Sequence, residues 1–113
     1  MGVLICGLSN AGKTTYSKRF DDVIHYDNVG GTTRQRLEHI VNEAAKREVC
    51  VEGVYNEAFR RAELANAMQG RKVCLWIDTP LDVCMKRPQF RGTRTFEPPT
   101  YDEGWDEIVI VRN

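Results

Sequence analysis

The stretch that decides the fold is residues 3–20, which read Val3-Leu4-Ile5-Cys6-Gly7-Leu8-Ser9-Asn10-Ala11-Gly12-Lys13-Thr14-Thr15-Tyr16-Ser17-Lys18-Arg19-Phe20. Its first four residues are apolar, as in a buried strand, and its last part places Tyr16 and Phe20 four residues apart, as on one face of a helix. The loop between them, residues 7–14, fits G-x-x-x-x-G-K-[ST] at every fixed position. The stretch therefore predicts a strand, a phosphate-binding loop and a helix.

The chemistry of this loop follows from its residue types. The glycines allow backbone N–H groups to turn inward, and together with the positive end of the helix these donors form a cradle for phosphates. Lys13 would reach the β- and γ-phosphates of ATP or another NTP, and the Thr14 hydroxyl would bind Mg²⁺. The nucleotide-binding residues predicted here are Gly7, Ser9, Asn10, Ala11, Gly12, Lys13, Thr14 and Thr15.

Length and composition narrow the class of protein. A chain of 113 residues suits a single domain, here residues 1–113. Its sixteen basic and sixteen acidic side chains cancel, so any binding of a polyanion must come from a local cluster. No apolar run approaches membrane-spanning length, the N-terminus leads directly into a strand, and the four cysteines show no C-x-x-C spacing. We therefore expect no membrane contact and a cytoplasmic location in a reducing, intracellular compartment.

Apolar strands alternate with amphipathic helices along the rest of the chain. Strands are predicted at residues 23–26, 49–52, 73–77 and 108–111. A Thr32–Gln35 capping box would open a helix that runs to about residue 47, and further helices are predicted after Asn56 and after Thr79-Pro80. In the second of these helices Phe59, Ala62, Ala65 and Met68 are predicted to point inward. The pattern predicts a single three-layer α/β domain with a five-stranded, mostly parallel sheet covered by helices on both faces.

Acidic residues end three of these strands. In nucleoside kinase-like sheets the third strand commonly lies beside the first, which would place Glu52 one strand and Asp27 two strands from the phosphate loop. Glu52 would then hold Mg²⁺ or its waters, and Asp27 would accept a proton from the attacking group. Strand-end acids also cap helices or bind loop amides, and this alternative stays open. Asp78 is predicted to be a turn residue, and His25 to be structural or solvated.

Basic side chains gather in a stretch without periodicity. Lys86, Arg87, Arg91 and Arg94 fall within nine residues. We predict a short lid at about residues 86–97, in which an Arg neutralises the transferring phosphoryl group and closure excludes water; the alternative is a solvated loop. The stiff Pro98-Pro99 pair is predicted to form a wall of the base pocket. Arg34, Arg36, Arg60 and Arg61 form a possible acceptor-phosphate patch, although exposed helix charge is favoured for each alone.

Four segments together resemble the kinase domain of polynucleotide 5′-hydroxyl kinases, in a minimal phage- or bacterial-type version. They are residues 7–14, the strand ending in Asp27, residues 78–84, and above all Phe96-Glu97-Pro98-Pro99-Thr100-Tyr101-Asp102-Glu103-Gly104-Trp105-Asp106-Glu107-Ile108. The resemblance spans nearly the whole chain and implies a P-loop kinase domain that transfers the ATP γ-phosphate to a 5′-hydroxyl of DNA or RNA, as in nucleic acid repair.

The resemblance also implies residue roles. By the match of positions, Lys13 and Thr14 would contact the phosphates and metal, Asp27 would be the general base, and Arg91 or Arg94 would stabilise the transition state. The chain departs from the family in three respects: Gly30 occupies the position of the usual acceptor-binding Arg, the lid is short, and the acid of the third strand is Glu52 rather than Asp.

Two other functions remain open on the sequence. A kinase of nucleosides, nucleotides or other small metabolites would suit the compact lid and the zero net charge. A non-catalytic NTP-binding switch is the second, but it would need neither Asp27 nor an Arg-bearing lid. The sequence does not indicate an oligomeric state.

Overall fold

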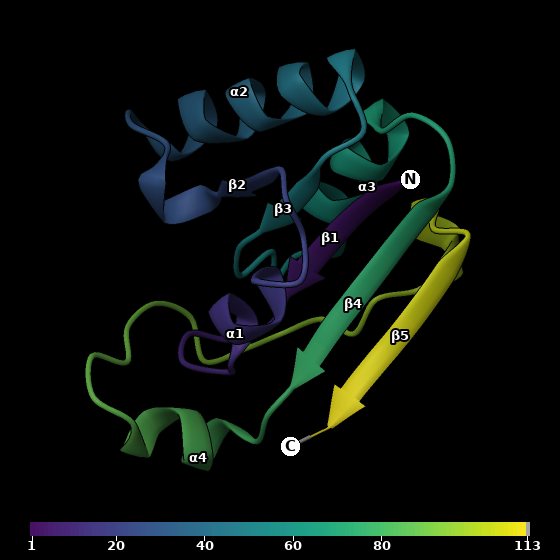
Figure 1. Ribbon diagram of the computed structural model, residues 1–113. Coiled ribbons are helices and arrows are strands. Elements are labelled where there is room, and N and C mark those ends of the chain that lie inside the picture. The colour runs from purple at the N-terminus through teal and green to yellow at the C-terminus, as the bar shows by residue number, and fades with distance from the viewer. Residues whose placement is uncertain (113) are drawn as a thin grey trace.

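Five strands form the centre of the molecule. The computed structural model describes residues 1–112, in which the strands are β1 (Gly2–Cys6), β2 (Val23–His25), β3 (Cys50–Glu52), β4 (Lys72–Asp78) and β5 (Glu107–Arg112). They lie in the order β2-β3-β1-β4-β5, and each neighbouring pair is parallel (Figure 1). This confirms the predicted α/β fold, including the position of the third strand beside the first.

Helices cover the two faces of the sheet. They are α1 (Lys13–Ser17), α2 (Thr33–Lys46), α3 (Ala58–Ala67) and α4 (Leu81–Lys86), with single 3-10 turns η1 (Tyr26–Asn28) and η2 (Tyr101–Glu103). α2 begins at the predicted capping box: the Gln35 backbone N–H donates to the Thr32 hydroxyl over 3.2 Å, and the Thr32 backbone N–H donates to the Gln35 side chain over 2.9 Å. Within residues 1–112, no helix has both the length and the apolar composition needed to cross a membrane.

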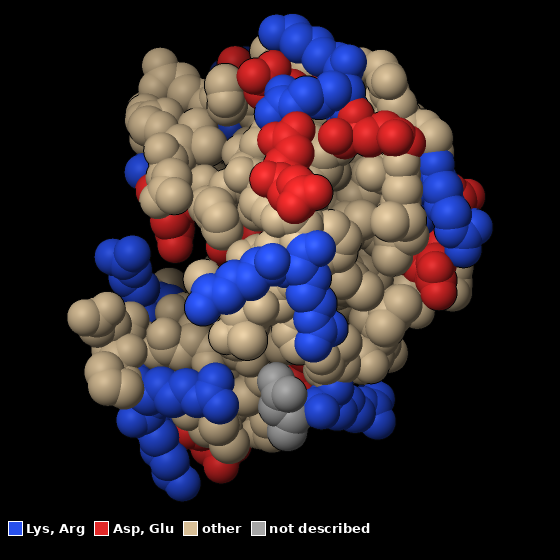
Figure 2. Space-filling model, in the orientation of Figure 1, with Lys and Arg blue, Asp and Glu red and all other residues tan. Residues whose placement is uncertain are grey.

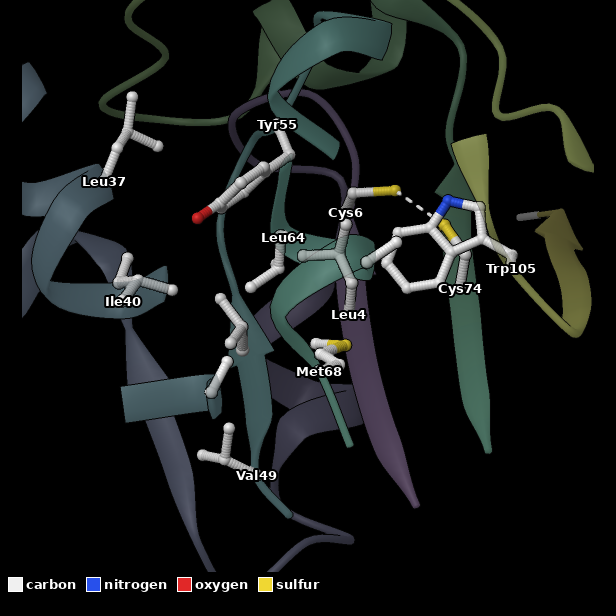
Figure 3. Close-up of a cluster of buried hydrophobic side chains, with 13 residues drawn as sticks. Leu4, Cys6, Leu37, Ile40, Val49, Tyr55, Leu64, Met68, Cys74 and Trp105 are labelled. Atoms are coloured by element: carbon white, nitrogen blue, oxygen red, sulfur yellow. Dashed lines mark hydrogen bonds between the residues drawn. The ribbon is translucent and has the colours of Figure 1, made fainter. Parts of the chain in front are cut away.

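The core is divided by the sheet. On the side of α2 and α3, Leu4 and Cys6 of β1 pack with Ile40 and Leu64 from the two helices (Figure 3). On the other side, the remaining buried residues of β1 and β4 pack with the phosphate loop and with Cys84 of α4. Every residue of β1 is buried, because strands pair with both of its edges and side chains cover both of its faces.

One predicted helix face was wrong. Phe59, expected to point inward from α3, is 51% exposed, whereas the Arg61 side chain is fully buried. Arg61, Leu64 and Ala65 are the buried residues of the helix. The apolar pattern missed this face because its first member is a charged residue, which is buried with an ion pair to Glu103 and hydrogen bonds to the Tyr55 and Glu97 carbonyls.

An irregular segment, residues 87–106, returns the chain from α4 to the start of β5 (Figure 1). It supplies side chains to the α3 face of the sheet in place of a helix: Trp105 is buried there, and the Phe96 ring stacks on Trp76 with centroids 5.5 Å apart. Arg61 fixes this segment by donating to Glu103 over 2.8 Å and to the Glu97 carbonyl over 2.7 Å. Helices therefore cover less of β4 and β5 than the sequence pattern predicts.

Candidate active site

A cleft of about 1300 Å³ opens at the carboxyl ends of the strands. It brings together four parts of the chain that are far apart in sequence: the phosphate loop, the ends of β2 and β3, the first turn of α2, and the segment after α4. The residues that line it are Ser9, Asn10, Gly12, Lys13, Thr14, Thr15, Asp27, Arg36, Glu52, Gly53, Val54, Arg87, Gln89, Phe90, Arg91 and Gly92. Figure 2 shows Lys and Arg side chains gathered over the half of the molecule that holds α1 and α4.

The phosphate loop has the backbone geometry that its sequence predicts. Gly12 is the N-cap of α1 with φ at +109°, a left-handed conformation that favours glycine. Gly7 passes so close to β4 that a Cβ atom there would lie 2.7 Å from the Ile77 carbonyl oxygen. Both glycines are therefore required by the path of the loop.

Lys13 is buried beneath this loop. Its Nζ donates to the Leu8 carbonyl over 2.6 Å, within the cleft wall. Burial lowers the pKa of Lys13, and the carboxylates of Glu52 and Asp27 oppose that shift. The ammonium group thus lies within electrostatic reach of both strand-end acids.

Asp27 lies in η1, directly after β2, and lines the cleft. Within residues 1–112 its carboxylate forms no hydrogen bond or ion pair, so it neither caps a helix nor binds a loop amide. Asp78, in contrast, lies outside the cleft lining and forms an ion pair with Arg112 at 3.6 Å.

Glu52 has a partner that the sequence did not suggest. Its Oε1 lies 2.8 Å from Nδ1 of His25, which gives His25 a structural contact at the end of β2. The two residues are direct neighbours in the register of β2 and β3. Their pairing depends on the order of the strands, and the positions of both residues at strand ends were the only signal of it in the sequence.

The donor set fits Mg²⁺ bound together with a nucleotide. Mg²⁺ in phosphate-transfer sites takes one or two protein carboxylates and completes its shell with phosphate oxygens and water. The Thr14 hydroxyl and the Glu52 carboxylate line the same cleft and supply oxygen donors of this kind. Within residues 1–112, no group of three or more His, Cys, Asp and Glu side chains is arranged to hold a metal ion without such a ligand.

The segment after α4 is attached to the phosphate loop at its start. The Asn10 side chain donates to the Pro88 carbonyl over 3.0 Å, and Nη1 of Arg87 donates to the Asn10 carbonyl over 2.6 Å. The Arg91 backbone N–H donates weakly to the Ser9 hydroxyl over 3.4 Å. Nothing in the sequence motif indicated this role of Asn10, because its position in the motif is variable.

The structure places only some of the predicted lid and base-pocket residues in the cleft. Arg91 lines the cleft, and so does Arg87, which belongs to the predicted lid but had not been singled out as its catalytic arginine. Arg94, Pro98 and Pro99 lie outside the cleft lining, on the part of the segment that leads back toward α3.

Comparison with known proteins finds a solved structure with a similar fold. No protein-family model and no curated protein sequence matches the chain. Among solved structures, the chain is similar to the crystal structure of an unliganded sugar kinase from Janibacter sp. HTCC2649, with a TM-score of 0.71 and 15% identity over 98% of this chain and 84% of that chain. The chain therefore shares the fold of a kinase. The particular likeness to polynucleotide kinases rests on the sequence segments alone.

Proposed function

We propose that the protein is an ATP-using, Mg²⁺-dependent phosphotransferase whose acceptor is the 5′-hydroxyl of DNA or RNA. The observation that carries the proposal is the meeting, in one cleft, of the phosphate loop, the unpaired Asp27 carboxylate and the guanidinium-bearing segment after α4. The kinase fold of a solved structure supports phosphoryl transfer, and the segment 96–108 supports a polynucleotide acceptor.

Each cleft residue has a distinct part in this reaction. Loop N–H groups and Lys13 bind the phosphates, while Thr14 and Glu52 would hold Mg²⁺, whose charge offsets that of the phosphates. Asp27 accepts the proton of the acceptor hydroxyl as its oxygen bonds to the γ-phosphorus and the bond to the β–γ bridging oxygen breaks, leaving ADP. Arg91 neutralises charge on the transferring group, since it lines the cleft whereas Arg94 does not.

One alternative is a kinase of a sugar or another small metabolite. The similar solved structure is described as a sugar kinase, and the net charge of zero gives this chain no general attraction for polyanions. A non-catalytic switch is less well supported, because it would need neither the Asp27 carboxylate nor the arginines of the segment after α4 in the cleft.

The test is transfer of label from γ-labelled ATP to a panel of acceptors. The panel contains DNA and RNA oligonucleotides with a 5′-hydroxyl, nucleosides, nucleoside monophosphates and simple sugars. We expect label on the oligonucleotides. Label on sugars or nucleosides alone would establish the alternative, and ATP binding without transfer to any acceptor would establish a switch.

A further inference from the structure

His25 is a residue beside the cleft that the reaction described above does not use. It is the last residue of β2, and its Nδ1 atom lies 2.8 Å from Oε1 of Glu52, its direct neighbour in the register of β2 and β3. Because a carboxylate only accepts hydrogen bonds, Nδ1 donates to Glu52. The contact therefore joins the ends of two neighbouring strands at the edge of the sheet where the cleft opens.

The two carboxylate oxygens of Glu52 have different surroundings. Oε1 accepts from His25, whereas Oε2 forms no hydrogen bond within residues 1–112 and is not closed off from solvent. The Glu52 side chain is only 12% exposed, and it lines the cleft. His25 thus occupies one oxygen and leaves the other open to a ligand in the cleft.

The position of Glu52 indicates the kind of ligand. Lys13 and Thr14 line the same cleft, and Mg²⁺ bound with phosphates takes one or two protein carboxylates. Burial lowers the pKa of Lys13, and the charge of Glu52 opposes that shift most strongly, so the carboxylate lies near the phosphate-binding lysine. A Glu side chain has several rotatable bonds and keeps one orientation only where another contact holds it. Within residues 1–112, His25 supplies that contact.

We propose that His25 is a positioning residue, whose hydrogen bond to Oε1 holds the Glu52 carboxylate so that Oε2 stays available to Mg²⁺ bound with a nucleotide. This inference rests on the proposed function, in which Glu52 holds Mg²⁺ directly or through a bound water, and adds a residue to it. His25 itself touches neither the metal nor the phosphates. Partners of this kind, which orient a ligand of the metal, contribute about 10- to 100-fold in metal affinity.

A purely structural pair would have a different effect. Such a pair would stabilise the ends of β2 and β3, and its loss would weaken the fold or the nucleotide site with or without metal. A positioning residue acts on the metal-dependent part of nucleotide binding alone. The affinity for nucleotide in the presence and absence of Mg²⁺ therefore separates the two roles.

The first experiment measures binding of a non-hydrolysable ATP analogue by calorimetry, once with excess Mg²⁺ and once with a chelator. The ratio of the two affinities is the gain due to Mg²⁺. The variants are His25→Leu, which has no donor, and His25→Asn, whose side-chain amide can donate in place of Nδ1. The matched control is His39→Leu, because His39 is exposed on α2 and lies outside the cleft lining.

We expect Mg²⁺ to tighten binding by wild type and by His39→Leu to the same extent. His25→Leu should lose about tenfold of that gain, or all of it where the gain is smaller, and His25→Asn should recover most of it. Binding without Mg²⁺ should stay within about threefold of wild type. The inference is overturned if wild type binds equally well with and without Mg²⁺, or if His25→Leu keeps the wild-type gain. A loss for His25→Leu that is as large without Mg²⁺ as with it also overturns the inference.

A double-mutant cycle then shows whether His25 acts through Glu52. Glu52→Gln should reduce the gain due to Mg²⁺, and adding His25→Leu to it should cause no further loss, because no carboxylate is left to position. Losses that add independently would overturn the inference. Urea denaturation of each variant checks that it is folded under the conditions of the binding experiment.

Because the binding experiment uses no acceptor, its outcome does not depend on phosphoryl transfer. If the gain due to Mg²⁺ depends on His25 but wild type phosphorylates nothing in the acceptor panel, the proposed function fails and the role of His25 stands. If wild type phosphorylates an acceptor while His25→Leu keeps the full gain due to Mg²⁺, the inference alone fails.

Discussion

At the scale of single residues, the cleft contains charged groups that no partner of opposite charge neutralises. Within residues 1–112, neither the Asp27 carboxylate nor the Arg36 guanidinium forms an ion pair, and the same holds for Arg87 and Arg91 in this cleft. Folding alone gives no reason to place Asp27 and Arg36 in one cleft. The Asp27 carboxylate is exposed in the cleft, where it can meet the hydroxyl of a bound acceptor.

Asp27→Asn tests the general base, because it keeps the shape of the side chain and removes its proton affinity. We expect ATP affinity to stay within a few fold and phosphoryl transfer to fall by about 10²–10⁴. ATP binding is measured by calorimetry and transfer by labelled ATP. Loss of ATP binding with transfer retained would move Asp27 to the metal site.

Arg91→Ala tests the transition-state role of the cleft arginine, with Arg94→Ala as the matched control outside the cleft. We expect kcat to fall by about a hundredfold or more for Arg91→Ala, with ATP affinity little changed, because the contact strengthens only as charge moves in the transition state. Arg94→Ala should behave as wild type in the same steady-state assay. Equal effects of the two substitutions, or a loss for Arg94→Ala only, would refute the assignment.

At the scale of elements, the sequence predicted what local pattern determines. Residues 3–20 alone define a strand, a phosphate loop and a helix, and the Thr32–Gln35 pair defines the start of α2. The buried face of α3 was not predictable in this way, because Arg61 is buried with partners far away in sequence, Glu97 and Glu103, the latter 42 residues later. The His25–Glu52 pair and the contacts of Asn10 likewise join segments that only the folded sheet brings together.

Asn10 joins the phosphate loop to the end of α4, and its removal should loosen the following segment. Asn10 has φ at +64°, so Asn10→Gly keeps the backbone conformation and removes only the side chain. We expect faster amide hydrogen exchange across residues 84–92, with β1 unchanged, because three carbonyl contacts of the side chain are lost. Unchanged exchange in that segment would show that the other contacts suffice to hold it.

The Arg61–Glu103 pair anchors the irregular segment that replaces a helix. Arg61→Met leaves a buried carboxylate without its partner, and we expect the free energy of unfolding to fall by about 3–5 kcal/mol. The matched control is Arg60→Met, since Arg60 forms a surface pair with Glu63, and its effect should be within about 1 kcal/mol. Urea denaturation of both variants is the measurement, and equal values would contradict the anchoring role.

The same pair predicts how stability depends on pH. Burial alone would raise the pKa of Glu103, but hydrogen bonds from Arg61 and Trp105 outweigh it and lower that pKa below the ordinary value of 4.5. A carboxyl whose pKa is lower in the folded state than in the unfolded state stabilises the fold when the pH is above its unfolded-state pKa. This stabilisation is lost as the pH falls through its folded-state pKa. We expect the free energy of unfolding, measured by urea denaturation, to fall less steeply with decreasing pH for Glu103→Gln than for wild type. An identical pH profile would show that Glu103 does not contribute.

At the scale of the whole molecule, a neutral chain concentrates its charges by region. The sixteen basic and sixteen acidic side chains cancel in sum. Lys and Arg nevertheless gather around α1 and α4, whereas acidic and basic side chains are mixed over α2 (Figure 2). This local basic surface borders the cleft at the carboxyl ends of the strands. It fits a phosphate-bearing ligand without any general attraction for polyanions.

The most direct test of the central claim is label transfer from γ-labelled ATP to one oligonucleotide with a 5′-hydroxyl, by wild type and by Lys13→Ala. The same strand with a 5′-phosphate is the acceptor control. We expect wild type to label only the 5′-hydroxyl strand, and Lys13→Ala to fold but transfer at least about a hundredfold more slowly, because the phosphates lose a preorganised charge. Transfer at the wild-type rate by folded Lys13→Ala, or no transfer by wild type that binds ATP, would contradict the account.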